Sequence, residues 1–318
     1  MNTLVVPCHR ADLMAEWLRA WDGPAADWDE LIVVEDGPAR TFDLPPGAVH
    51  ASWAEIAADA GADAAIFSRR DSAIRCYGFL LAYRRGATLI GSLDSDCFPA
   101  DDRGFFARHR TALDESPRWT PSIPEVRTRG LPYANFGRLG RVAVSMGLWS
   151  RVADLDAVTS LADLGQAALR DFRPPAGTRV MPRGQYFPFC GMNNVFRREV
   201  CPLMYYPPMG EGSPFARMDD LWAGLVWQRA CDHLGYLSVV GEPHVVHQRA
   251  SDPFVNLVKE APGIPKHEWF WEAVDAVPLT GRSPQACVLE LGEGLARHED
   301  EYLARWGRSL LAWLNLFD

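Results

Sequence analysis

Two aspartates one residue apart, Asp94 and Asp96, close the apolar run 87–93, and a Cys-Phe-Pro tripeptide follows them. An apolar run that ends in carboxylates and then a proline predicts a buried strand with an acidic end. Carboxylates at this spacing can share a hard cation, because Mg²⁺ and Mn²⁺ prefer oxygen ligands and Mg²⁺ is usually held by one or two carboxylates plus substrate phosphates. The alternative is a turn, where aspartate is common because its side chain bonds nearby backbone.

The elements that must position this pair alternate along the first third of the chain. We expect strands at 4–7, 31–34 and 88–93, a short strand at 64–67, and helices at 13–21, 52–60 and 71–85. Strands that alternate with helices indicate βαβ units and a mostly parallel sheet. In such sheets the ligand crevice lies beyond the carboxyl ends of the strands. The polar segments 7–10, 35–37 and 94–96 are therefore expected to converge there.

The remainder of the chain is less regular. Residues 117–188 are rich in Pro, Gly and Arg and indicate long loops with short elements. A helix over 221–234, apolar nearly all round, predicts a buried element that Gly235 ends. Strands are expected at 237–240 and 244–247 with a turn between them, and a C-terminal helix presents an apolar stripe for core or subunit packing.

Composition excludes several classes of protein. The 318 residues suffice for one large domain or two modest ones, and the net charge of −9 argues against nucleic-acid binding but not against a small anionic substrate. The seven scattered cysteines indicate reduced thiols. The N-terminal residues lack the features of a signal peptide, and no apolar stretch approaches the ~20 residues of a membrane span. We therefore expect a soluble cytoplasmic protein.

Several blocks of the sequence together resemble one family. They are Val33-Val34-Glu35-Asp36-Gly37, Asp71-Ser72-Ala73-Ile74-Arg75-Cys76-Tyr77-Gly78, Asp94-Ser95-Asp96-Cys97-Phe98, Val144-Ser145-Met146-Gly147-Leu148-Trp149, Cys190-Gly191-Met192-Asn193, Asp219-Asp220-Leu221-Trp222-Ala223-Gly224, Cys231-Asp232-His233-Leu234-Gly235 and 250–257. In this order they resemble the reversibly glycosylated polypeptides, plant mutases that interconvert UDP-arabinopyranose and UDP-arabinofuranose.

The resemblance implies an α/β fold of the glycosyltransferase A type, a Rossmann-like, mostly parallel sheet flanked by helices, with a C-terminal helical extension. It also implies Mn²⁺ or Mg²⁺ as cofactor and a nucleotide diphosphate sugar, UDP- or GDP-linked, as partner. We expect the catalytic domain to span residues 1–290 and a packed C-terminal helix to span 291–318. No pattern reveals the oligomeric state, and a homo-oligomer is one option.

The resemblance gives the acidic strand end a role. Asp94 and Asp96 are expected to meet ribose and metal, and His247 is similar to the downstream histidine that completes the cation's ligands. Histidine is a common metal ligand. The alternative for His247 is a hydrogen-bonded structural histidine. The family usually has three consecutive aspartates here, so Ser95 is a departure that leaves the outer carboxylate pair intact.

Other residues are assigned to the nucleotide and the sugar. Asp36 is placed to bind base or ribose, with a turn residue as its alternative, and Arg10 and Arg75 are candidates for phosphate contacts, with solvated surface charges as theirs. We add the following to the candidate site: Pro7 and Ser95 for the nucleotide, and Cys190, Asn193 and Trp222 for the sugar.

The catalytic candidates are two aspartates and one arginine. Asp219 and Asp220 begin the buried helix, and two adjacent carboxylates exceed what a helix cap needs and push their pKa values apart. The family is reversibly glycosylated on an arginine in a Gly-Tyr-Pro-Phe-Ser-Leu-Arg-Glu-Gly stretch. The matching region 130–140 departs from that stretch, so Arg138 is the candidate by position, with Arg129 and Arg141 nearby.

The resemblance implies a metal-dependent mutase that breaks the anomeric C–O bond to diphosphate reversibly and exchanges pyranose for furanose. A glycosyltransferase of the same fold is the first alternative, because a metal–diphosphate site serves both reactions. A non-catalytic protein that binds nucleotide sugars is the second alternative, although such a protein has no need of the aspartates and the histidine.

Overall fold

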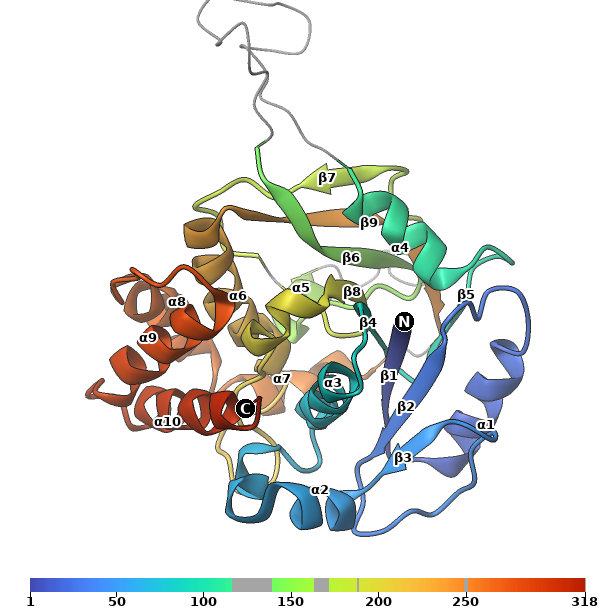
Figure 1. The fold of residues 1–318 in the computed structure, drawn as a ribbon, viewed down its shortest axis with the longest axis horizontal. Helices are drawn as coiled ribbons and strands as arrows, with labels where there is room; N and C mark the ends of the chain where they lie inside the picture. Colours follow the sequence, from blue (N-terminus) through green and yellow to red (C-terminus); the bar gives the residue numbers. More distant parts are fainter. Residues whose placement is uncertain (116–138, 163–171, 188, 249–250, 318) are drawn as a thin grey trace, which may run out of the picture.

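The computed structural model describes residues 1–115, 139–162, 172–187, 189–248 and 251–317. Its strands form one twisted sheet (Figure 1). They are β1 Asn2–Cys8, β2 Glu30–Glu35, β3 Val49–Ala51, β4 Leu89–Leu93, β5 Cys97–Pro99, β6 Arg141–Arg151, β7 Thr178–Val180, β8 Asn193–Arg197 and β9 Tyr236–His247.

The order of strands in the sheet is β3-β2-β1-β4-β8-β6-β9-β5, with β7 paired to β9. The ladders among β3, β2, β1 and β4 are all parallel. β8 is antiparallel to both β4 and β6, and β6 is parallel to β9. β4, β6 and β9 therefore all end at the same edge of the sheet, and β8 begins there. The α/β class is confirmed, and antiparallel ladders are confined to the half of the sheet beyond β4.

Helices cover both faces of the sheet. The α-helices are α1 Ala11–Ala20, α2 Trp53–Ala60, α3 Arg75–Arg84, α4 Phe105–Leu113, α5 Ala157–Ala162, α6 Asp219–Leu234, α7 Pro253–Glu260, α8 Ile264–Asp275, α9 Pro284–Ala296 and α10 Glu301–Asn315. Side chains alternate along β1: Val5 joins the core under α3, α6 and the C-terminal helices, whereas Leu4 and Val6 join the core under α1 and α4. α8, α9 and α10 gather on one side of the molecule (Figure 1).

The helix α3 lies very close to the parallel strands. A Cβ atom on Gly78 would come within 2.4 Å of Val5 Cγ1 and 3.0 Å of Val34 Cγ2. Only a residue without a side chain permits this approach, because interiors are close-packed and an added methyl group has nowhere to go. The close contact places the start of α3, and with it Arg75, directly over the ends of the strands.

Most expected elements of the first third are confirmed, as is the end of α6 at Gly235, which has a φ of 78°. Residues 64–67 are not a strand, because most of them lie in a short 3₁₀ helix, Gly61–Ile66. The expected turn in 237–247 is also wrong. β9 runs through Gly241, where its register with β6 shifts as in a β-bulge, so the chain bends without reversing.

The middle of the chain holds a long strand, β6, where loops with short elements were expected. β6 is buried on both faces for most of its length, so its side chains show no alternation in polarity. Ser145 and Gly147 also interrupt its apolar run. Because of these two features, the sequence of β6 lacks the periodicity by which strands are predicted.

The C-terminal helices are part of the main core. α9 and α10 pack closely at Gly307, where a Cβ atom would come within 2.2 Å of the Ala296 backbone nitrogen. Trp306 and Trp313 of α10 are fully buried with the side chains of α3 and α6. The division of the chain at residue 290 stays a prediction. In the part of the chain that the structure describes, no helix has both the length and the apolarity to cross a bilayer.

A buried polar network joins the strands β6, β8 and β9 behind the site edge. The Asn193 amide nitrogen donates to Leu148 O (2.9 Å) and Pro243 O (3.0 Å), so its oxygen is the acceptor that faces His109 Nε2 at 3.1 Å. His109 Nε2 therefore carries the ring proton, and Nδ1 accepts from the Ser145 hydroxyl at 2.9 Å. The network holds His109 in its neutral form.

This network predicts a pH dependence of stability. Burial lowers the pKa of His109 to about 3, from the ordinary value of 6.5 that applies in the unfolded chain. Below pH 6.5 only the unfolded chain takes up the proton, so the free energy of unfolding falls by about 1.4 kcal/mol per pH unit until the pH nears 3. Urea unfolding at pH 7, 6, 5 and 4 measures this slope. His109→Gln reduces the slope, and equal slopes in both proteins would contradict the assignment.

Candidate active site

The turn after β4 brings two of the predicted ligands to the site edge. Cys97 N donates to Asp94 O at 3.1 Å, which closes the turn, and the chain then enters β5. β5 pairs antiparallel with the end of β9, so that Cys97 lies opposite His247. Asp96 Oδ2 consequently lies 3.8 Å from His247 Nε2, and both side chains are largely buried.

The imidazole of His247 is oriented by the backbone. Its Nδ1 lies 3.0 Å from Val152 O, which can only accept, so Nδ1 carries a proton and Nε2 is the nitrogen that faces Asp96. A carbonyl behind the ring is the usual partner of a histidine that binds a metal. Asp96 and His247 therefore fit a hard divalent cation as a pair of ligands, with water and substrate phosphate as the remaining ligands.

Asp94, the third predicted ligand, forms an ion pair with Arg75. Arg75 Nη2 binds Asp94 Oδ1 at 2.6 Å, and the arginine side chain is 2% exposed, against 29% for the aspartate. Within the described residues, no group of three or more His, Cys, Asp or Glu side chains lies close enough together to hold a metal ion. The predicted set of three ligands is thus divided: Asp96 and His247 meet, while Asp94 is bound to a cation of the protein.

Besides Asp94, Arg75 donates hydrogen bonds to three other oxygen atoms of the protein. Its Nε donates to Ser72 O at 2.9 Å, and Nη1 donates to Ser92 Oγ at 2.9 Å and to Gly191 O. Burial alone would lower the pKa of Arg75, but the carboxylates of Asp94 and Asp219 raise it above its ordinary value. Arg75 is a permanent buried cation that ties α3, β4 and the segment before β8 together. A direct phosphate contact through Arg75 stays a prediction.

The two aspartates that begin α6 have different partners. Asp219 Oδ2 accepts from Ser72 Oγ at 2.7 Å, and Asp220 Oδ2 accepts from Gly191 N at 3.0 Å. Neither is the N-cap residue, which is Met218, and both lie in the first turn, where the helix dipole favours negative charge. Burial and the neighbouring charge of Asp219 raise the pKa of Asp220 well above its ordinary value.

Asp36 serves the structure of the site. Its Oδ1 accepts from Trp53 Nε1 (2.8 Å) and from Arg70 N (3.0 Å), and its Oδ2 accepts from Asp71 N (3.0 Å). These three bonds fix the chain just before α3. Whether Asp36 also contacts a nucleotide stays a prediction.

Three further nucleotide candidates lie at or near the strand ends. Pro7 is half-buried in β1 opposite Val34, and Ser95 lies beside the thiol of Cys8, the last residue of β1. Arg10 follows β1 and forms an ion pair with Asp12 at 2.5 Å, and its side chain is 37% exposed. Their contacts with a nucleotide stay predictions.

The three candidates for sugar contacts differ in how far they are buried and in which groups they bind. Cys190 faces the site and donates to Asp154 Oδ2 at 3.2 Å. Asn193 is fully buried and all its polar atoms bind protein groups, so it positions strands and has no group left for a sugar. Trp222 is also fully buried, between Phe215 and Phe270, and its indole donates to His267 Nδ1. The expectation of direct sugar contacts is therefore corrected for Asn193 and Trp222.

Asp154 is a site residue that the sequence interpretation missed. It follows the end of β6 and lies near enough to contribute, after burial and other groups, to raising the pKa of Cys190, Asp220 and Cys97. The rule that polar residues at strand ends mark a site would have found it, had β6 been recognised as a strand.

Arg138 and Arg129 lie outside the described residues, so the role of Arg138 stays a prediction. Arg141 begins β6, forms an ion pair with Glu199, and lies at the end of the sheet opposite to His247.

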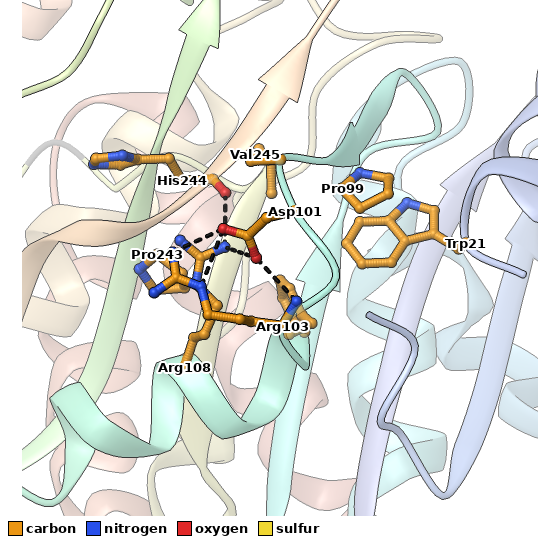
Figure 2. A pocket seen from close by; sticks show the side chains of 10 residues that line it. Trp21, Pro99, Asp101, Arg103, Arg108, Pro243, His244 and Val245 are labelled. Carbon is orange, nitrogen blue, oxygen red and sulfur yellow. Dashed lines mark hydrogen bonds and ion pairs between the residues drawn. The ribbon is translucent and has the colours of Figure 1, made fainter. Parts of the chain in front are cut away.

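A small pocket lies away from these residues, between α4 and the strands β5 and β9 (Figure 2). Its two arginines surround one carboxylate: Arg103 Nη2 lies 2.7 Å and Arg108 Nη1 lies 3.6 Å from Asp101. Arg108 also reaches His244 O at 3.4 Å. Because Asp101 already lies between these cations, the pocket is not suited to an anion.

The bonds of Arg75 predict a large loss of stability when they are removed. Arg75→Gln leaves the Asp94 carboxylate and the Gly191 carbonyl without their cation, and we expect the free energy of unfolding to fall by about 3 kcal/mol or more. The matched control is Arg103→Gln, which breaks an exposed ion pair with Asp101 and costs less than about 1 kcal/mol. Urea denaturation measures both, and equal losses would contradict the central role of Arg75.

Comparison with known proteins shows the family of this chain. A sequence model of the family described as "Reversibly glycosylated polypeptide" matches residues 126–318. UDP-arabinopyranose mutase 3 of Arabidopsis thaliana is 32% identical over 99% of this chain and 90% of its own length. UDP-arabinopyranose mutase 1 of the same plant is 33% identical over 99% and 91%, and UDP-arabinopyranose mutase 1 of Oryza sativa subsp. japonica is 31% identical over 91% and 83%. The chain belongs to the reversibly glycosylated polypeptide family.

Proposed function

We propose that this protein is an isomerase that interconverts the pyranose and furanose forms of a UDP-linked sugar. The near full-length similarity to proteins named UDP-arabinopyranose mutase supports this reaction. One structural observation carries it to this chain: a single sheet edge joins the Asp96–His247 pair to a group of buried carboxylates through Arg75 and Asp94. The first feature suits a diphosphate–cation complex, and the second suits proton transfer to and from a sugar.

The reaction has two requirements that the site can meet. The anomeric C–O bond to diphosphate must break and re-form, and the ring oxygen must be exchanged for another hydroxyl of the same sugar. A divalent cation held by Asp96 and His247 would neutralise the charge that develops on the diphosphate. The site then needs groups that hold the sugar and move protons between its oxygens.

The chain's own residues preorganise the edge for this chemistry. Arg75 fixes Asp94, and Asp220 fixes the Gly191 amide, so the strand end and the segment before β8 keep one arrangement. Groups that are already oriented do not have to reorganise when charge develops, which is the main source of electrostatic catalysis. Because an imidazole binds a cation only through a neutral nitrogen, we expect cation binding to weaken in mild acid.

A substrate panel tests the reaction and separates the alternatives. The purified protein is incubated with Mn²⁺ or Mg²⁺ and a set of UDP- and GDP-sugars, and the products are chromatographed. We expect a new peak of unchanged mass from a UDP-pentose. Release of nucleotide diphosphate that depends on an added acceptor would instead indicate a glycosyltransferase. Saturable binding without any product would indicate a non-catalytic protein.

The proposed cation pair predicts a specific loss of metal binding. Asp96→Asn and His247→Gln each remove one ligand, so we expect at least a tenfold weaker affinity for Mn²⁺ in the presence of UDP, measured by the paramagnetic resonance of free Mn²⁺. Mutase turnover should fall in parallel. The matched control is Asp114→Asn, a surface carboxylate that pairs with Arg197. Unchanged Mn²⁺ affinity in both site variants would remove the metal assignment.

A further inference from the structure

The helix α7 exposes its apolar side chains and buries its polar ones. Phe254, Val255 and Val258 are 62%, 50% and 76% exposed, whereas Asn256 and Glu260 are only 6% and 2% exposed. Among the helices of the described residues, only α7 has more than one strongly exposed large apolar side chain. A surface helix normally turns its apolar side to the core. The reverse orientation is expected of a helix whose apolar side meets a second molecule.

The exposed apolar residues lie on one side of α7. Phe254, Val255, Val258 and Ala261 stand at positions i, i+1, i+4 and i+7, which share one face of a helix. Ala261 follows the last residue of α7, keeps helical dihedral angles (φ −49°, ψ −40°) and is exposed, as is Pro262. We call these five residues the α7 face. Single exposed apolar residues are normal, but a contiguous group marks an interaction site.

Buried polar contacts fix this orientation of α7. Glu260 Oε1 accepts from Arg217 Nε at 2.7 Å, and Glu260 Oε2 accepts from Ala157 N at 2.7 Å. Asn256 Nδ2 donates to Ser251 Oγ at 2.6 Å. A rotation of α7 that buried the α7 face would pull the Glu260 carboxylate away from both of its donors, and breaking a buried ion pair is strongly unfavourable. The α7 face therefore stays outside.

Two opposite charges lie at the ends of the α7 face. Asp252 precedes the helix and Lys259 lies in its last turn, and both are exposed. They are seven residues apart, which places them on the same side of the helix and about 10 Å apart along its axis. If two copies of α7 pack antiparallel about a two-fold axis, Asp252 of each copy lies beside Lys259 of the other. The α7 face is therefore complementary to itself, as a closed dimer requires.

The same charges argue against a lipid surface as the partner. Helices that lie in a membrane interface are rich in Lys and Arg on their polar side. Lys259 is the single basic residue of α7, and Glu260 follows it. The chain as a whole has a net charge of −9, so anionic headgroups would repel it.

We propose that the α7 face is the contact of a homodimer, in which α7 packs antiparallel against α7 of a second copy. The two apolar faces cover each other, and an Asp252–Lys259 ion pair forms at each end. A helix of eight residues is about 12 Å long, so the contact is small and the dimer dissociates on dilution. The dimer does not depend on the proposed mutase reaction, and its test needs no substrate.

Sedimentation velocity over a range of protein concentrations tests the dimer. The native protein should show a species of twice the 35.4 kDa of the chain, with a share that rises with concentration. Val258→Glu places a charge within the α7 face and should weaken dimerisation at least about tenfold. The matched control is Leu289→Glu on α9, where the residue is also exposed, and it should dimerise like the native protein. Both variants should keep the native midpoint of urea unfolding.

The charged ends give a second, independent test. Lys259→Glu places like charges together at both ends of the contact, so dimerisation should weaken roughly fivefold. Adding Asp252→Asn removes this repulsion and keeps the helix cap, because asparagine is as good an N-cap residue as aspartate. The double variant should therefore recover part of the lost affinity. This recovery is specific to an antiparallel arrangement, since a helix that is merely destabilised would not regain affinity.

Three results would overturn the proposal. The first is a native protein that stays monomeric at the highest concentrations used for sedimentation. The second is a dimer that Val258→Glu leaves as stable as the native one, which would place the contact on another surface. The third is a monomer that binds phosphatidylcholine–phosphatidylserine vesicles through Val258, which would make the α7 face a lipid contact. A dimer that Val258→Glu and Lys259→Glu weaken, and that Leu289→Glu does not, supports it.

Discussion

The buried guanidinium of Arg75 is the interaction on which the rest of the site depends. Carboxylates are expensive to bury together, because each loses its hydration and repels the next. Asp94, Asp219 and Asp220 approach one another at a single sheet edge, and Arg75 is the cation placed among them. It also binds backbone and hydroxyl oxygens of three separate segments. Arg75 therefore fixes Asp94 directly and offsets the negative charge of Asp219 and Asp220, which other groups hold in place.

The close approach of α3 to the sheet explains why that side chain is so well placed. Gly78 lets the helix lie against Val5 and Val34, one turn after Arg75. The guanidinium therefore reaches the ends of the strands from a helix, which is a more rigid support than a loop. Sites that stand on helices and strands hold their groups more accurately than sites on loops do.

Local sequence patterns predicted the elements whose two faces, or whose ends, differ in polarity. The parallel strands 4–7, 31–34 and 88–93, the polar residues after them and the stop of α6 at Gly235 were all legible. β6 was not, since a strand buried on both faces shows no alternation. The turn expected in 237–247 failed because a glycine and a proline in a strand can mark a bulge as well as a reversal.

Side-chain roles were harder to predict than elements, because they depend on partners far away in the sequence. Asn193 and Trp222 have chemistry suited to sugars, yet His109 and His267 occupy their polar groups. Residue type and spacing indicate what a side chain can do, and tertiary structure decides what remains available.

The ladder between β5 and β9 has a consequence for the length of these two strands. Asp96 and His247 meet because Asp96 is the turn residue directly before Cys97, and Cys97 is paired with His247. A shift of this ladder by one residue would place another residue opposite Cys97 and turn His247 to the other face of the sheet. A change in the length of β5 or β9 would therefore separate Asp96 from His247, whereas a change in segments outside this ladder would leave the two side chains together.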